Sequence, residues 1–147
     1  MALSTTGHTD AAHRAYRWLA TIQNPDGSWP AKLRQTRIVN PIREANHAAY
    51  PAVGVWHHLL ITGDEEFAES MWPMVRDGIG FVLGLQTDRG EIRWARDPDG
   101  SPGDHALLTG CASIYQALRC AAALGDRLGR AQPDWELAAA RLGHLIA

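Results

Sequence analysis

A repeat of about 63 residues constrains the fold of this chain more than any other feature of its sequence. Gln23 and Gln86 each end a stretch of helical periodicity, and a glycine follows each of them four residues later. The same spacing separates Trp72 from Trp135, which both lie near the start of a helical stretch. Self-similarity at a fixed period is typical of arrays whose units bury their apolar faces against one another. The sequence therefore predicts a helical array.

Each unit of the repeat reads as a helix, a turn-rich connection and a second helix. In the second unit, apolar residues recur at helical spacing over 64–86 and again over 107–125, and turn residues fill the segment between them. In the first unit, the same pattern predicts helices over 9–23 and 46–62, and the first helix of a third unit begins at 133. Short segments between the turns predict small hairpins in the connections. The chain thus contains about two and a half helical units and belongs to the all-α class.

Length and charge point to a single globular domain over residues 1–147. Hydrophobic residues make up 46% and charged residues 20% of the chain, which distinguishes it from a disordered segment. The net charge of −2 argues against a nucleic-acid binder, which would show a basic stripe. The longest apolar run, 79–85, is too short for a membrane span, and residues 1–13 lack the pattern of a signal peptide. We therefore expect a cytoplasmic protein.

The cysteines and histidines predict neither a disulfide nor a metal site. Cys111 and Cys120 lie nine residues apart in one predicted helix, so they point to opposite faces and cannot bond to each other. The sequence contains no CxxC and no Cys/His cluster at zinc spacing. The adjacent His57 and His58 point about 100° apart on a helix and cannot share a metal from one face. We expect no cofactor.

The segment 23–29, QNPDGSW, is similar to the Gln…Asp-Gly-Ser-Trp motif of α/α-toroid proteins such as squalene-hopene cyclases and protein prenyltransferase β subunits. The second unit keeps Gln86 and Gly90, but Trp94 lies two residues late. The segments 67–83 and 90–110 resemble glucoamylase-type six-hairpin glycosidases. From Ala11 onward the chain resembles an actinobacterial group that carries the label prenyltransferase and whose members look like six-hairpin glycosidases.

This resemblance implies an incomplete α/α toroid, in which helices alternate between an inner and an outer ring. The active site would lie where the loops and the N-termini of the inner helices face a central cavity. A complete ring needs about six hairpins, so the chain is expected to be a truncated domain that supplies part of a cavity wall. The helix beginning near Asp134 would then lack a partner. Its apolar stripe of Leu137, Leu142 and Leu145 predicts self-association.

The resemblance favours a carbohydrate-acting, glycosidase-like protein that is inactive in this short form. One alternative is an isoprenoid-handling toroid related to prenyltransferases or squalene cyclases. Against it, Asp97-Pro98-Asp99-Gly100 is one aspartate short of the cyclase acid motif, and no zinc set of Asp, Cys and His is evident. A non-catalytic binding or assembly module is a third possibility. The expected ligand is a carbohydrate or an isoprenoid accordingly.

Glycoside hydrolysis needs two carboxylates on either side of the scissile bond. The carboxylates in connections or at helix starts are Glu44, Glu91, Asp97 and Asp104, of which Glu44, Glu91 and Asp104 are the catalytic candidates. Asp104 is also a good N-cap for the helix that follows, and Glu91 reads equally as a solvated strand residue. No capping or turn role accounts for Glu44, so it is the first candidate to test.

Candidate binding residues lie beside these carboxylates. The start of the second helix carries a similar pair in each unit, Asn46-His47 in the first and Asp104-His105 in the second. Trp29 and Trp94 lie in connections, where their rings are able to stack on sugars or isoprenoid chains. The motif around Trp29 also has a structural interpretation, in which the ring pins the hairpin and the glutamine amide caps a neighbouring helix.

Overall fold

The computed structural model describes residues 1–147 and confirms a mostly helical chain with a few short strands. The helices are α1 (Ala2–Thr5), α2 (Thr9–Thr21), α3 (Ala45–Thr62), α4 (Glu65–Leu83), α5 (Leu108–Arg127) and α6 (Pro133–Ile146). The strands are β1 (Lys32–Arg34), β2 (Arg37–Asn40), β3 (Arg43–Glu44) and β4 (Ala95–Arg96). No helix combines the length and the apolar character needed to cross a bilayer.

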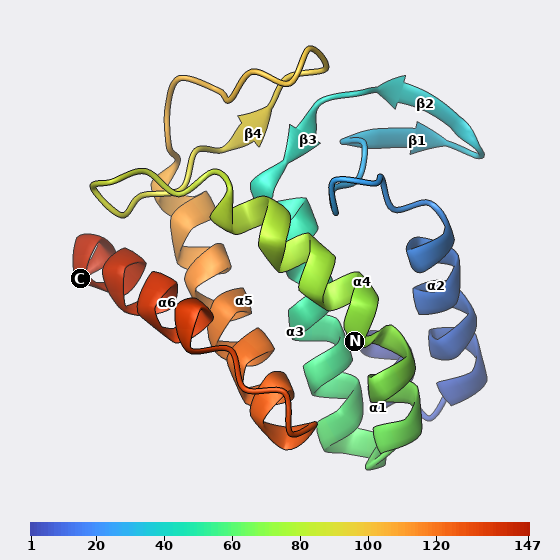
Figure 1. Cartoon of the computed structure of the whole chain (residues 1–147). Coiled ribbons are helices and arrows are strands. Elements are labelled where there is room, and N and C mark those ends of the chain that lie inside the picture. The colour runs from blue at the N-terminus through green and yellow to red at the C-terminus, as the bar shows by residue number, and fades with distance from the viewer.

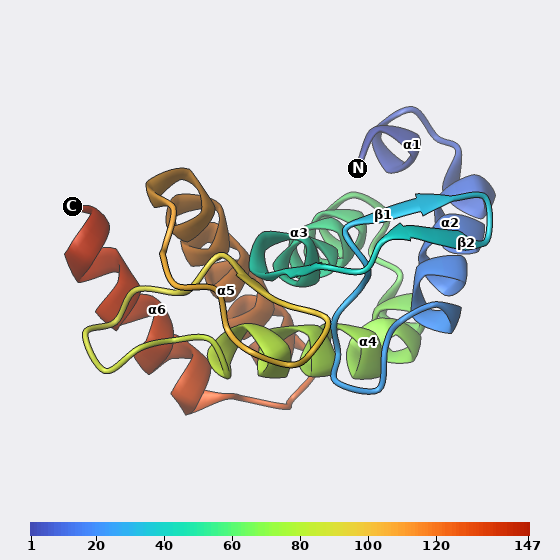
Figure 2. The ribbon, with the colours of Figure 1, turned by 90° about the horizontal axis from the view of Figure 1, so that it is seen from above.

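Helices α3 and α5 lie side by side, with α4 packed on α3 and α6 packed on α5. Figure 1 shows α2 and α6 on opposite sides of the molecule, and one continuous buried cluster extends through the helices from α2 to α6. The two long connections and all four strands gather at one end of the helices, and the short turns lie at the other end (Figures 1 and 2). The end with the strands, here called the loop end, is where α3 and α5 begin.

The repeat is a structural repeat, because the two glutamines make the same hydrogen bonds. The Gln23 amide donates to the carbonyl of Gly27 at 2.9 Å and to that of Met74 in α4 at 3.0 Å. The Gln86 amide donates to the carbonyl of Gly90 at 2.9 Å and to that of Ala138 in α6 at 3.1 Å. Each glutamine therefore ties its own turn to the helix of the next unit. The carbonyls of Met74 and Ala138 lie in the middle of α4 and α6, so the expectation that the glutamine amide caps the end of a neighbouring helix is wrong.

The turn after each glutamine requires glycine. Gly27 has a φ of 87°, and a Cβ at this position would lie 1.9 Å from the carbonyl oxygen of Asp77 in α4. Gly90 has a φ of 107°, and its Cβ would lie 3.2 Å from the carbonyl oxygen of Arg141 in α6. Both the backbone conformation and the close approach of the next helix exclude a side chain.

We expect Gln86→Ala to lower the free energy of unfolding by about 1–3 kcal/mol, because two carbonyls lose their side-chain donor. Urea unfolding followed by circular dichroism measures the change. Gln116→Ala is the matched control, since Gln116 lies on the exposed face of α5 and bonds only to the sulfur of Cys120. Equal effects of the two substitutions would show that the Gln86 bonds contribute nothing specific.

The strands add one pairing to the predicted pattern. The hairpin of the first connection is present, with β1 and β2 antiparallel. In the second connection, the turn at Gly90 folds the chain back so that Ile92 forms a single antiparallel bridge with Gln86, which is too short to count as a strand. Beyond it, β4 pairs with β3 of the first unit, with Glu44 opposite Ala95. The second connection therefore contains the predicted hairpin-like turns, with a second antiparallel bridge between Arg96 and Pro102, and β4 in addition completes a sheet between the units.

The predicted apolar stripe on the last helix is also wrong at one position. Leu142 is completely buried in the core, whereas Leu137 and Leu145 are exposed. Leu137 and Leu142 are five residues apart and thus point about 140° apart, so they occupy different faces of α6. Self-association through α6 would rest on Leu137 and Leu145, and it stays a prediction.

Candidate functional site

A hollow of about 160 Å³ lies at the loop end, between the first turns of α3 and α5. Its lining combines a carboxylate, an amide, hydroxyls, one indole ring and a few aliphatic side chains. The polar and aromatic members are Glu44, Asn46, Tyr50, Trp94, Thr109 and Ser113. Small-molecule sites typically pair an apolar lining with a few convergent polar groups. This hollow is therefore the candidate site.

Glu44 is placed at the hollow by the sheet between the units. It pairs with Ala95 across β3 and β4, and the backbone N–H of Ala45 donates to the carbonyl of Trp94 at 2.8 Å. Glu44 occupies the N-cap position of α3, but its side chain makes no capping hydrogen bond. Its carboxylate instead lies 3.6 Å from Nε2 of His47, one turn further along. The side chain is thus held near a helix N-terminus, which favours a negative charge.

The preceding residue, Arg43, anchors β3 in this position. Its guanidinium pairs with Asp26 at 2.9 Å and also donates to the carbonyl of Asp97. Burial acts to raise the pKa of Asp26, but hydrogen bonds from Ser28 and the charge of Arg43 outweigh it, so this pKa is lowered. Arg43 therefore joins the connections of both units directly beside Glu44.

Trp94 lines the hollow and is supported from outside by His105. The two rings are stacked with centroids 5.7 Å apart, and the backbone N–H of Trp94 donates to the backbone carbonyl of His105 at 3.1 Å. The His105 ring in turn contacts the Asp104 carboxylate, with 2.7 Å between Nδ1 and Oδ1. Trp94, His105 and Asp104 therefore form one group beside the hollow.

The prediction that Asp104 caps a helix is wrong. Helix α5 begins at Leu108, its N-cap position is Leu107, and no side chain caps it. The reason is that residues 101–107 are held by the sheet, where Gly103 donates its N–H to the carbonyl of Ala95. The Asp104 side chain is almost fully exposed, and the hydrogen bond with His105 lowers its pKa. An exposed carboxylate with a lowered pKa is not prepared to act as a general acid.

The hollow is not lined by five of the predicted site residues: Trp29, His47, Glu91, Asp104 and His105. Glu91 is half-buried in the turn before Ile92, and a hydrogen bond with its own backbone N–H lowers the pKa of its carboxyl. Trp29 is only 5% exposed, and its Nε1 donates to the carbonyl of Leu19 at 2.9 Å. The burial and the hydrogen bond of Trp29 support its structural role in pinning the hairpin, and a role of its ring as a stacking platform stays a prediction.

The repeat explains why Trp94 is not a displaced copy of Trp29. The residue 63 positions after Trp29 is Ile92, which is also buried, at 1% exposure. Ile92 thus fills the core position in the second unit, and Trp94 is free to line the hollow.

Three lining residues escaped the sequence analysis: Tyr50, Thr109 and Ser113. The repeat contained the signal, because Thr109 lies 63 residues after Asn46, and Ser113 lies 63 residues after Tyr50. Equivalent positions on α3 and α5 therefore face the same hollow.

No protein-family model matches the chain. A curated protein of Mycolicibacterium hassiacum, named MMP endo-(1,4)-3-O-methyl-alpha-D-mannosidase, is 52% identical over all 147 residues. The chain spans 41% of the length of that relative. Among solved structures, a sugar epimerase from a ruminal bacterium superposes with a TM-score of 0.75 over 98% of this chain and 37% of its own, at 13% identity. That likeness concerns the fold alone. Neither name supports the prenyltransferase alternative.

Proposed function

We propose that this chain is part of a glycosidase-like protein that acts on α-linked mannose chains, and that the hollow at the loop end contacts the sugar. The observation that carries this proposal is the 52% identity to an endo-mannosidase over every residue of the chain. The hollow supports it, because amide, carboxylate and hydroxyl groups surround an indole ring there. Such a lining suits a polar ligand with flat apolar faces, which is the character of a sugar.

We propose further that the helical units form part of an α/α toroid. Helices α3 and α5 begin 63 residues apart, and Gln23 and Gln86, which follow α2 and α4, have the same spacing, as the hairpins of such a ring would. The mannosidase relative and the epimerase are each more than twice as long as this chain. The remaining hairpins of a protein of that length would supply the opposite wall of the cavity.

In this proposal Glu44 is one of the two carboxylates of the reaction. His47, 3.6 Å away, orients the carboxylate and stabilises its negative charge. Glycoside hydrolysis needs a second carboxylate about 5–9.5 Å from the first, across the scissile bond. Glu91 and Asp104 do not line the hollow. The second carboxylate would therefore come from the remainder of a longer protein, and the 147 residues alone would be inactive.

The other lining groups would bind the sugar without reacting. Asn46, Thr109 and Ser113 offer amide and hydroxyl groups to sugar hydroxyls, and Trp94 offers its ring as a stacking surface. His105 and Asp104 would act through Trp94, by holding the orientation of its ring.

A chimera tests the proposal. This chain replaces the 147 matching residues of the M. hassiacum mannosidase, and the release of reducing ends from (1,4)-linked 3-O-methyl-α-mannan is measured. We expect the chimera to be active and the isolated chain to be inactive. A folded but inactive chimera would contradict the proposed function and would favour isoprenoid handling or a non-catalytic module. Turnover by the isolated chain would contradict the two-carboxylate argument.

A further inference from the structure

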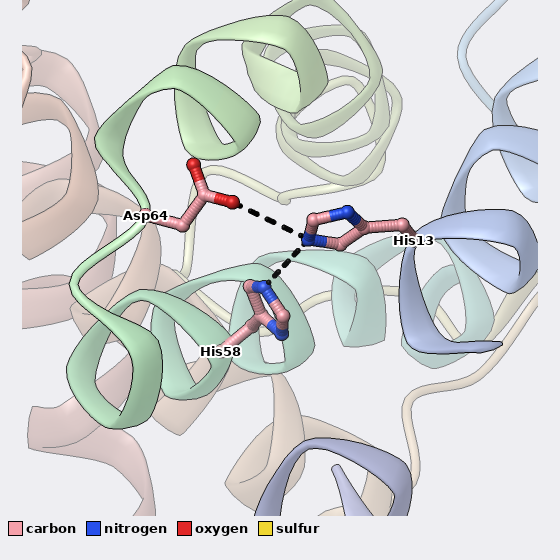
Figure 3. Close-up of side chains that lie close together, drawn as sticks. All are labelled: His13, His58 and Asp64. Atoms are coloured by element: carbon pink, nitrogen blue, oxygen red, sulfur yellow. Dashed lines mark hydrogen bonds and ion pairs between the residues drawn. The ribbon is translucent and has the colours of Figure 1, made fainter. Parts of the chain in front are cut away.

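Three potential metal ligands meet at the end of the helices opposite the hollow: His13 of α2, His58 of α3 and Asp64 at the turn before α4 (Figure 3). The Nε2 atoms of the two histidines are 3.1 Å apart, and Nε2 of His13 is 3.5 Å from Oδ2 of Asp64. Each residue contributes one ligand atom, and all three atoms lie within 4.8 Å of one another. His13 lies 45 residues before His58, and the three positions match no known spacing of metal ligands in a sequence. The sequence analysis therefore predicted no metal site here.

Each of the three side chains is held in place by a second contact. Nδ1 of His58 bonds to the hydroxyl of Ser4 at 2.9 Å, and the His13 ring stacks on Phe67 with 3.9 Å between centroids. Oδ1 of Asp64 accepts the backbone N–H of Phe67 at 2.8 Å, which leaves Oδ2 directed toward His13. Metal-ligating histidines and carboxylates usually have such outer partners, which fix the ring orientation and the ligand geometry.

The charge state of the cluster suits a cation. His58 is completely buried. A histidine ligates a metal through a neutral imidazole nitrogen. Two neutral imidazoles and one carboxylate carry a single negative charge, which a divalent cation would balance. The side chains of His13 and Asp64 are 18% and 31% exposed, so the cluster is open to the solvent on one side.

We propose that His13, His58 and Asp64 form a zinc site with three protein ligands and a fourth position open to water. Zinc binds imidazole nitrogen at about 2.0–2.1 Å and carboxylate oxygen at about 2.0–2.2 Å in tetrahedral geometry, which places neighbouring ligand atoms about 3.3 Å apart. Two of the three observed separations, 3.1 and 3.5 Å, bracket this value, and the third, between His58 and Asp64, is within 4.8 Å. Because the site joins α2, the end of α3 and the start of α4, its ion would stabilise the fold and would act independently of the hollow.

Competition with a chromogenic chelator, starting from the metal-free chain, measures zinc affinity and stoichiometry. We expect one zinc per chain and at least a tenfold loss of affinity in His13→Gln and in Asp64→Asn. Asparagine is itself a good N-cap, so Asp64→Asn keeps the start of α4 and folds. Asp10→Asn and His144→Gln remove exposed groups of the same kinds and should bind zinc as the wild type does. Cobalt in place of zinc should give the visible absorption of tetrahedral cobalt.

Zinc should also raise the Tm by about 5–10 °C when free zinc exceeds its Kd a hundredfold. The rise should be absent in Asp64→Asn, whose helical circular dichroism should match that of the wild type. An absence of binding at micromolar zinc, or equal binding by the wild type and both ligand variants, would overturn the proposal. The three residues would then form only a hydrogen-bonded chain.

Discussion

Replacing Trp29 by alanine should lower the free energy of unfolding by about 3–5 kcal/mol, the usual cost of removing a large buried aromatic side chain. The indole ring is 5% exposed, and its N–H is satisfied by the carbonyl of Leu19 at the end of α2. The ring also lies against Gly78 of α4, where an added Cβ would be 3.5 Å from it. Alanine would leave a cavity between two helices and one carbonyl without its donor, and both effects destabilise the fold.

Urea unfolding followed by circular dichroism measures this effect. Trp18→Ala is the matched control, because Trp18 belongs to the same region of the chain but is 47% exposed. Its substitution should change stability by no more than about 0.5 kcal/mol. If Trp29→Ala left the denaturation midpoint unchanged, the ring would have to lie at the surface, and its interpretation as a ligand platform would be favoured.

The helices were predictable because their signals are local. Apolar periodicity and flanking turn residues predicted a helix over 46–62, and α3 spans Ala45–Thr62. The repeat predicted the next equivalent helix, and α5 begins 63 residues after α3. The pairing of β3 with β4 was not predictable in the same way. It joins segments about fifty residues apart, each only two residues long, so neither segment has a pattern of its own.

The candidate site was predictable only in part, for the same reason. Glu44 and Asn46 were placed correctly because both belong to the start of one helix. Trp94 lies at the hollow because the sheet between the units holds the neighbouring Ala95 opposite Glu44. Its position also depends on Ile92, which occupies the core position that Trp29 fills in the first unit. Applying the repeat to Asn46 would have identified Thr109. No sequence signal connects His13 with His58, because only the packing of α2 against α3 and α4 brings them together.

Glu44→Gln in the chimeric mannosidase should reduce kcat by about 10²–10⁴-fold, the usual contribution of a positioned carboxylate to proton transfer. Glutamine keeps the size of the side chain and its hydrogen bonding but removes the charge and the proton affinity. Folding should be unaffected, because the Glu44 side chain makes no capping bond in α3.

Glu91→Gln in the same chimera is the matched control, since that carboxylate does not line the hollow. It should leave kcat within about twofold, well below the loss expected for a catalytic carboxylate. Equal losses in both variants would point to a general effect of charge. Full activity in Glu44→Gln would remove Glu44 from the reaction and leave the hollow with a binding role alone. A fall in kcat at an unchanged KM is the result that assigns Glu44 to the chemical step, because the substrate would then bind as before and only the transition state would lose stabilisation.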